Sequence, residues 1–183
     1  DRSSTSTQAT NRTAAKKMAP PPLAQALDYI DRALAAPPSS PDALAYAHGA
    51  AQKRAVRAHL ADLLKVFPGL AVRAADFHAN DGRVSRVLKV EGTVPMHYLG
   101  ARYNVPLVAW LPPEYPLAPP LAYVTPTPSM VVRAGHSFVD PGGQVSSPCV
   151  RAWRGSLGGS GGSDLSTAVQ EMAMLFGTEP PLY

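Results

Sequence analysis

The 183-residue chain has a single cysteine, Cys149, and no apolar run that approaches the roughly 20 residues of a membrane span. A lone cysteine excludes an intramolecular disulfide framework and a multi-cysteine zinc site. The five histidines show no pairing at metal-ligand spacing, so neither a metal nor a cofactor is expected. Charged residues make up only 16% of the chain and hydrophobic residues 45%, which predicts a globular core.

The net charge of +4 is unevenly placed. Residues 1–22 carry four basic side chains against Asp1 alone, a net charge of +3. The basic pI therefore reflects this stretch, and no nucleic-acid partner is expected. Because the same stretch has few apolar residues, we predict a disordered leader at residues 1–22 and a folded domain at residues 23–183. A transit peptide is an alternative interpretation of the leader.

Apolar residues at helical spacing predict three helices, at residues 23–35, 42–66 and 164–176. Ser163 is the predicted N-cap of the last helix, and Gly177 is placed to end it.

Alternating apolar residues between the second and third helices predict four strands, at residues 70–75, 84–93, 102–111 and 121–124. The turn Asn80-Asp81-Gly82 joins the first two strands as a hairpin, because these residues tolerate positive φ. The order predicts an α+β fold, with N-terminal helices packed on a four-stranded antiparallel meander and a C-terminal helix.

Several short proline-containing motifs follow one another from the second predicted strand to the C-terminal end. They are Gly92-Thr93-Val94-Pro95, Tyr103-Asn104-Val105-Pro106, Glu114-Tyr115-Pro116 with the pair Pro119-Pro120, Thr127-Pro128-Ser129-Met130, and Glu179-Pro180-Pro181. In this order and spacing, the chain resembles the ubiquitin-conjugating-enzyme variant (UEV) domains of the ESCRT-I subunit related to the tumour susceptibility gene protein. The resemblance covers about residues 42–183 and implies a ubiquitin-conjugating-enzyme-like fold that catalyses nothing.

The machinery of an active ubiquitin-conjugating enzyme is missing from the sequence. Such an enzyme needs a cysteine for the ubiquitin thioester and an asparagine, in a His-Pro-Asn motif, for the oxyanion. The family aligns that cysteine with Ser146. His136 lies about where the histidine of the motif would be, but no asparagine follows Asn104 in the chain. We therefore expect no catalytic residue and interpret Cys149 as a small hydrophobic residue of the fold.

The resemblance implies a groove for Pro-Thr/Ser-Ala-Pro peptides. A proline-rich peptide is preformed as polyproline II and docks between aromatic side chains at little entropic cost. The residues implied in peptide binding are Tyr98, Tyr103, Asn104, Pro106, Thr127, Met130, Leu182 and Tyr183.

The resemblance also implies a second surface, for ubiquitin, on the first hairpin and the exposed face of the sheet. The residues implied are His78, Asn80, Asp81, Trp110 and Tyr123. His78 and Ala79 replace an aliphatic residue and a phenylalanine of the family, which removes apolar contact. A simple turn at Asn80-Asp81 and a core position for Trp110 are the alternative interpretations.

The implied function is that of a non-catalytic ESCRT-I adaptor domain in the endosomal sorting of ubiquitinated cargo, within the multivesicular body pathway. Its implied partners are adaptor proteins with Pro-Thr/Ser-Ala-Pro motifs, ubiquitinated cargo, and other ESCRT-I subunits bound through regions outside this chain. It would be cytoplasmic and recruited to endosomal membranes without inserting into them. An alternative is an inactive variant that partners an active ubiquitin-conjugating enzyme in lysine-63-linked chain synthesis. A third hypothesis is an enzyme acting through Cys149 or Ser160.

Overall fold

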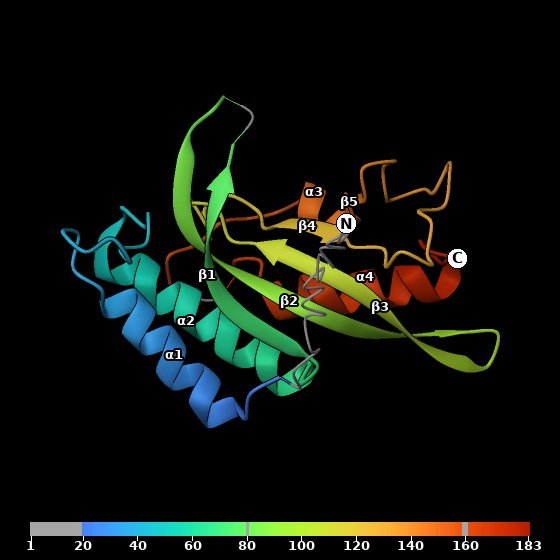
Figure 1. Ribbon diagram of the computed structural model, residues 1–183, viewed down its shortest axis with the longest axis horizontal. Coiled ribbons are helices and arrows are strands. Elements are labelled where there is room, and N and C mark those ends of the chain that lie inside the picture. Colours follow the sequence, from blue (N-terminus) through green and yellow to red (C-terminus); the bar gives the residue numbers. More distant parts are fainter. Residues whose placement is uncertain (1–19, 80, 159–160) are drawn as a thin grey trace, which may run out of the picture.

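The computed structural model describes residues 20–79, 81–158 and 161–183. The predictions for the leader up to residue 19, for Asn80 and for Ser160 lie outside these residues. The described elements, in chain order, are α1 (Leu23–Ala35), α2 (Gly49–Val66), β1 (Leu70–His78), β2 (Val84–Tyr98), β3 (Ala101–Trp110), β4 (Leu121–Val124), β5 (Gln144–Val145), α3 (Pro148–Arg151) and α4 (Leu165–Thr178) (Figure 1).

The strands form one antiparallel sheet in the order β1-β2-β3-β4-β5. Helix α4 packs on β2, α2 packs on α4, and α1 lies against α2 and β1 (Figure 1). The predicted α+β fold, with helices on an antiparallel meander, is confirmed. The structure adds β5 and α3, which have two and four residues and are too short to leave a periodic signal in the sequence.

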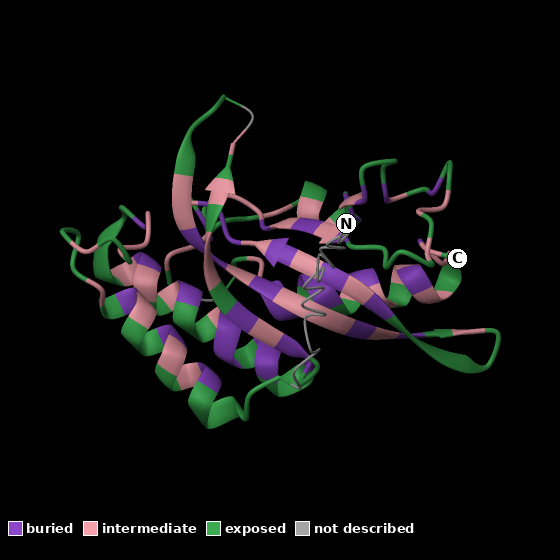
Figure 2. Cartoon of the chain, in the orientation of Figure 1, coloured by how far each residue is buried: buried purple, intermediate pink, exposed green. Residues whose placement is uncertain are grey.

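The core lies between the helices and the sheet face that they cover (Figure 2). Alternate residues of β3 are buried there, while the residues between them face the other side of the sheet. The buried residues of β3 are Val105, Leu107 and Ala109, and the intervening ones are Pro106, Val108 and Trp110. This period of two gives the sheet a second, partly open face.

Helix α2 begins at Gly49, seven residues later than the predicted start at residue 42. The preceding segment instead runs beside β2, where the Ala45 N–H donates to the Arg86 carbonyl oxygen at 2.8 Å. Tyr46 is buried, and its hydroxyl accepts from the Leu88 N–H and donates to the Leu111 carbonyl oxygen, each at 3.1 Å. These tertiary contacts override the helical propensity of the local sequence.

Helix α4 differs from the prediction at both ends. Asp164, not Ser163, is the N-cap: its carboxylate accepts from the Thr167 N–H at 2.8 Å. Gly177 lies inside the helix, which continues to Thr178. A Cβ atom at Gly177 would stand 2.7 Å from the His97 carbonyl oxygen, so this glycine permits close packing of α4 on β2 rather than ending the helix.

Gln52 is a fully buried polar side chain of α2 that holds the proline-rich loop after β3. Its amide nitrogen donates to the carbonyl oxygens of Pro113 at 2.6 Å and of Tyr115 at 2.7 Å. Its amide oxygen accepts from the His48 N–H at 2.8 Å. One side chain therefore satisfies three backbone groups and ties the start of α2 to the loop.

Replacing this amide should destabilise the fold. Gln52→Leu keeps a similar volume but leaves three backbone groups without partners, of which the Tyr115 carbonyl is buried, so we expect a loss of about 2–4 kcal/mol in the free energy of unfolding. Urea denaturation followed by circular dichroism measures this loss. Gln170→Leu, at an exposed position of α4, is the matched control and should change stability by less than about 0.5 kcal/mol. Equal midpoints for the two variants would contradict the assigned role of Gln52.

Candidate functional site

A groove of about 670 Å³ lies between the β2–β3 hairpin and the C-terminal segment. Seven of the eight residues predicted to bind peptide line it: Tyr98, Tyr103, Asn104, Pro106, Met130, Leu182 and Tyr183. The structure therefore brings together residues that lie up to 85 positions apart in the chain. Sequence reasoning missed the five other lining residues, Met96, Arg102, Val105, Arg133 and Pro180.

Two antiparallel ribbons form the walls of the groove. The first is the paired end of β2 and β3, where Met96 lies opposite Tyr103. The second forms where the segment after α4 turns back along Met130–Arg133: the N–H of Val131 donates to the Tyr183 carbonyl oxygen at 2.8 Å, and the N–H of Arg133 donates to the Pro181 carbonyl oxygen at 2.8 Å. The C-terminal end lies near the end of α4 (Figure 1).

The groove has a buried floor and exposed aromatic edges. Met96 and Val105 are buried, whereas the side chains of Tyr103 and Tyr183 are 49% and 68% exposed. An exposed tyrosine on a strand loses contact with water only when a partner covers it. These two rings are therefore available for an incoming ligand rather than used in the core.

Thr127 does not line the groove, contrary to the placement that the resemblance implies. Its hydroxyl lies 3.1 Å from the Ser129 hydroxyl, and its carbonyl oxygen accepts from the Met130 N–H at 2.9 Å. Thr127 therefore stabilises the turn that positions Met130 in the groove. A threonine followed by proline gives no sequence signal that separates these two roles.

A second hollow, of about 610 Å³, lies on the outer face of the sheet. Three of the residues predicted to bind ubiquitin line it, His78, Trp110 and Tyr123. Phe77 lines it too and was not predicted: its ring packs on Trp110 with centroids 5.5 Å apart. Phe77 thus supplies this face with an aromatic side chain next to the two positions, His78 and Ala79, where the family residues are replaced.

Trp110 is half-buried: it packs against the edge of the core and also lines the hollow. It therefore combines the two roles considered for it, a core position and a place on the outer face of the sheet. The ammonium group of Lys89 lies 5.3 Å from its ring centroid, a cation–π contact that holds the ring in place.

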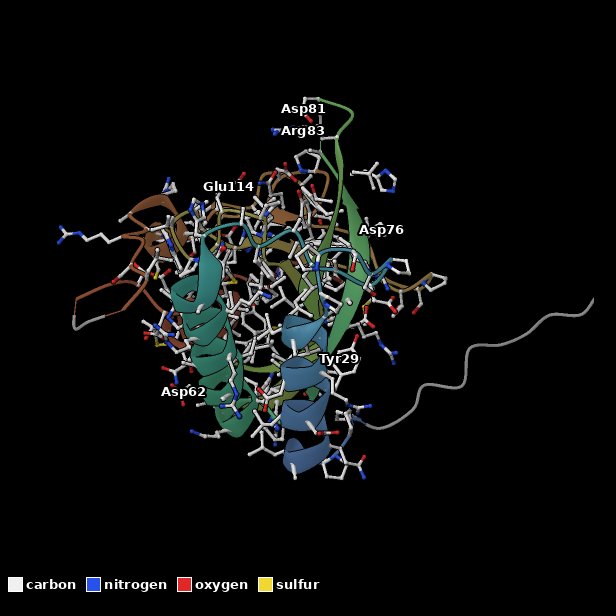
Figure 3. The ribbon with its side chains drawn as sticks, turned by 90° about the vertical axis from the view of Figure 1, so that its left-hand side faces the viewer. Tyr29, Asp62, Asp76, Asp81, Arg83 and Glu114 are labelled. Carbon is white, nitrogen blue, oxygen red and sulfur yellow. The ribbon has the colours of Figure 1, made fainter. Side chains whose placement is uncertain are left out.

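Asp81 lies away from this hollow, at the tip of the β1–β2 hairpin (Figure 3). Its carboxylate accepts from the Arg83 N–H at 3.0 Å and pairs with the Arg83 guanidinium at 2.6 Å. The backbone hydrogen bond from Arg83, followed by its side chain, lowers the pKa of Asp81. Asp81 is therefore ionised near neutral pH. It is exposed to solvent and also stabilises the turn.

In the region where an active conjugating enzyme has its catalytic groups, His136 and Ser146 form hydrogen bonds with the backbone. His136 is buried, with Nε2 2.7 Å from the Glu179 carbonyl oxygen and Nδ1 accepting from the Phe138 N–H at 3.0 Å. Both ring nitrogens are thus occupied by the backbone. Ser146 is exposed just after β5, and its N–H donates to the Phe138 carbonyl oxygen.

Cys149 is half-buried at the start of α3, where burial, followed by the charges of Glu171 and Asp164, raises the pKa of its thiol. A raised pKa disfavours the reactive thiolate. Across the described ranges, no group of three or more His, Cys, Asp or Glu side chains is placed to hold a metal ion. None of the helices described is long and apolar enough to cross a bilayer.

Comparison with known proteins gives several relatives. The chain is 34% identical to Protein ELC of Arabidopsis thaliana over 168 residues, which is 91% of this chain and 40% of that protein. It is 36% identical to the Tumor susceptibility gene 101 protein of Homo sapiens over 104 residues, 57% of this chain and 25% of that protein. The chain thus spans well under half the length of these relatives.

Two solved structures share the fold. One is the yeast Vps23 UEV domain in complex with a Vps27 PSDP peptide, with a TM-score of 0.67 at 20% identity over 86% of this chain and 94% of that one. The other is a complex of the Vps23 UEV with ubiquitin, with a TM-score of 0.58 at 21% identity over 86% and 96% of the two chains. The model of the UEV domain family matches residues 43–183, which include every described element except α1, and the chain therefore belongs to the UEV domain family.

Proposed function

We propose that the chain is a non-catalytic adaptor module of ESCRT-I that binds Pro-Thr/Ser-Ala-Pro peptides in the groove and ubiquitin on the outer sheet face and hairpin. The observation that carries the proposal is the groove itself, in which seven of the eight residues implied by the family come together. Its relatives include an ESCRT-I complex subunit of Dictyostelium discoideum, 29% identical over 94 residues, or 51% of this chain and 19% of that protein.

The groove suits a short proline-rich ligand. Tyr103 and Tyr183 offer exposed rings over a floor of Met96 and Val105, so a proline ring laid between them would be covered on several sides. A polyproline II peptide has free backbone carbonyl groups and little conformational entropy to lose. Asn104, exposed beside Tyr103, supplies both a donor and an acceptor for the ligand backbone or its hydroxyl residue.

The outer sheet face suits ubiquitin, which presents an apolar patch ringed by basic residues. Phe77, Trp110 and Tyr123 form an aromatic floor, and Asp81 at the hairpin tip adds negative charge (Figure 3). Apolar contact supplies the affinity, and the carboxylate orients the partner.

The positions of Ser146 and His136 support the absence of catalysis in this proposal. Ser146 stands where the family aligns its nucleophile, and the nearby His136 uses both ring nitrogens on the backbone. In this proposal the module recruits ubiquitinated cargo and adaptors at endosomal membranes from the cytoplasm, without inserting into the bilayer. Other ESCRT-I subunits would bind regions outside this chain. The relatives also include the Ubiquitin-conjugating enzyme E2 variant 3 of Danio rerio, 32% identical over 123 residues, or 67% of this chain and 25% of that protein.

Tyr103 should be the anchor of the peptide groove. Tyr103→Ala removes an aromatic surface that the ligand covers, so we expect a loss of about 1–3 kcal/mol in peptide affinity. Asn104→Ala should cost less, about 0.5–1.5 kcal/mol, if it removes one neutral hydrogen bond. Titration with a Pro-Thr-Ala-Pro peptide followed by NMR measures both. Tyr103→Phe is the control and should retain most of the affinity, since the ring remains.

The half-exposed Tyr103 side chain also predicts that the thermal midpoint of Tyr103→Ala barely moves. A large drop in that midpoint, together with normal peptide binding by the remaining folded protein, would place Tyr103 in the core and the groove elsewhere.

Ubiquitin should bind weakly, with a Kd on the order of 0.1–1 mM, and independently of the peptide. Asp81→Ala should weaken ubiquitin binding and leave peptide affinity unchanged, because the hairpin tip and the groove share no residue and distant changes act independently. Asp81→Asn, which keeps an acceptor for the Arg83 N–H, separates the loss of charge from the loss of the turn. Equal weakening of both ligands by Asp81→Ala would overturn the two-site assignment.

The chain should form no ubiquitin thioester. Incubation with activating enzyme, ATP and ubiquitin should leave Cys149 unmodified on a non-reducing gel, because its thiol has a raised pKa and is half-buried. An active conjugating enzyme in the same reaction is the positive control. A thiol-sensitive adduct that Cys149→Ser abolishes would refute the non-catalytic assignment.

A further inference from the structure

The peptide groove is positively charged as well as aromatic. Among its lining residues are two arginines, Arg102 and Arg133, and neither an aspartate nor a glutamate. Arg102 is exposed on β3 directly before Tyr103, and Arg133 is half-buried on the opposite ribbon. Each wall therefore contributes one arginine beside the aromatic edges of the groove.

Both charges remain available to a ligand. Within the described residues, neither Arg102 nor Arg133 forms a salt bridge, whereas five other arginines do: Arg32, Arg57, Arg73, Arg83 and Arg86. The position of Arg133 is fixed by its backbone, because its N–H donates to the Pro181 carbonyl oxygen. This hydrogen bond holds the Arg133 backbone on the groove wall that faces the β2–β3 hairpin.

Glu179 is the acidic side chain closest in sequence to the groove residues of the C-terminal segment, and it is already engaged. Its carboxylate accepts from the Ser137 N–H at 3.3 Å. The Ser137 side chain, followed by this backbone N–H, lowers the pKa of Glu179. Arg133 contributes to the lowering only through space, and less than the other groups do. Glu179 therefore attenuates the charge of Arg133 without binding its guanidinium.

A Pro-Thr/Ser-Ala-Pro motif is uncharged, so it leaves both guanidinium groups unused. A carboxylate in or beside the motif would pair with them, in a groove where apolar walls exclude part of the water. Resting on the proposed peptide function, we propose that this groove selects acidic proline motifs, peptides that carry an aspartate or glutamate within or directly beside the proline motif, and that Arg102 and Arg133 determine this selectivity.

Paired peptides test the selectivity directly. Each pair contains Pro-Thr-Ala-Pro with one aspartate placed before the motif, at its third position or after it, and the matched peptide carries asparagine there. At low salt we expect at least one aspartate peptide to bind about 3- to 10-fold more tightly than its asparagine partner, as for one or two partly exposed ion pairs. The ratio should fall in 0.5 M NaCl, because screening weakens exposed ion pairs.

Substitutions assign the effect to the two arginines. Arg102→Gln and Arg133→Gln should each reduce the aspartate-to-asparagine ratio, and the double variant should bring it to about one. Arg102→Lys should keep much of the ratio, because it keeps the charge. Arg151→Gln, which removes an exposed charge on α3 outside the groove, is the matched control and should leave the ratio unchanged.

The outcomes separate the two levels of the proposal. Binding of no peptide at all would refute the groove function. Tight binding of all peptides with equal affinity for aspartate and asparagine would refute the acidic selectivity and leave the groove function standing. A ratio that persists in the double variant, or that Arg151→Gln removes equally well, would show that net charge or other residues select the ligand and would overturn the assignment to Arg102 and Arg133.

Discussion

The close packing of α4 on β2 is the contact on which both the core and the groove depend. The buried side of α4 packs on the sheet at β2. Its large apolar residues are Leu165, Val169, Met172 and Phe176. Gly177 allows the last turn to approach the His97 carbonyl oxygen, which a side chain would prevent. Because the helix ends there, the following residues turn back along Met130–Arg133 and complete the second wall of the groove.

His136 illustrates how a position near a catalytic motif is used for structure in this fold. Its ring joins the segment before β5 to the end of α4 through the Glu179 carbonyl oxygen and the Phe138 N–H. A ring that contacts two backbone groups through its two nitrogens is held in one orientation. The contact with the Glu179 carbonyl oxygen fixes the start of the C-terminal segment, whose next residues line the groove. His136 therefore stabilises one wall of the groove without lining it.

The two candidate surfaces lie on different parts of one sheet. The groove uses the β2–β3 hairpin and the C-terminal segment, whereas the aromatic hollow and Asp81 belong to β1, β3, β4 and the β1–β2 hairpin. The two hairpins extend in different directions from the sheet (Figure 1). Since neither surface shares a lining residue with the other, both ligands could be held at once by one small domain, which increases the effective concentration of a partner that carries both.

The sequence by itself determined the elements whose patterns are local: α1, the alternating strands, the β1–β2 turn and the proline motifs that mark the family. It also identified seven groove residues, because the family motifs contain them. Only the tertiary structure decided what depends on distant partners. Residues 42–48 read as helix, yet Tyr46 and Ala45 pair with β2 and the loop after β3, and long-range hydrogen bonds outweigh a propensity of tenths of a kcal/mol per residue. The surfaces also contain Phe77, Arg102 and Arg133, which the sequence did not identify. Strand register and the packing of the C-terminal segment along Met130–Arg133 bring these residues to their surfaces, and no local spacing encodes that placement.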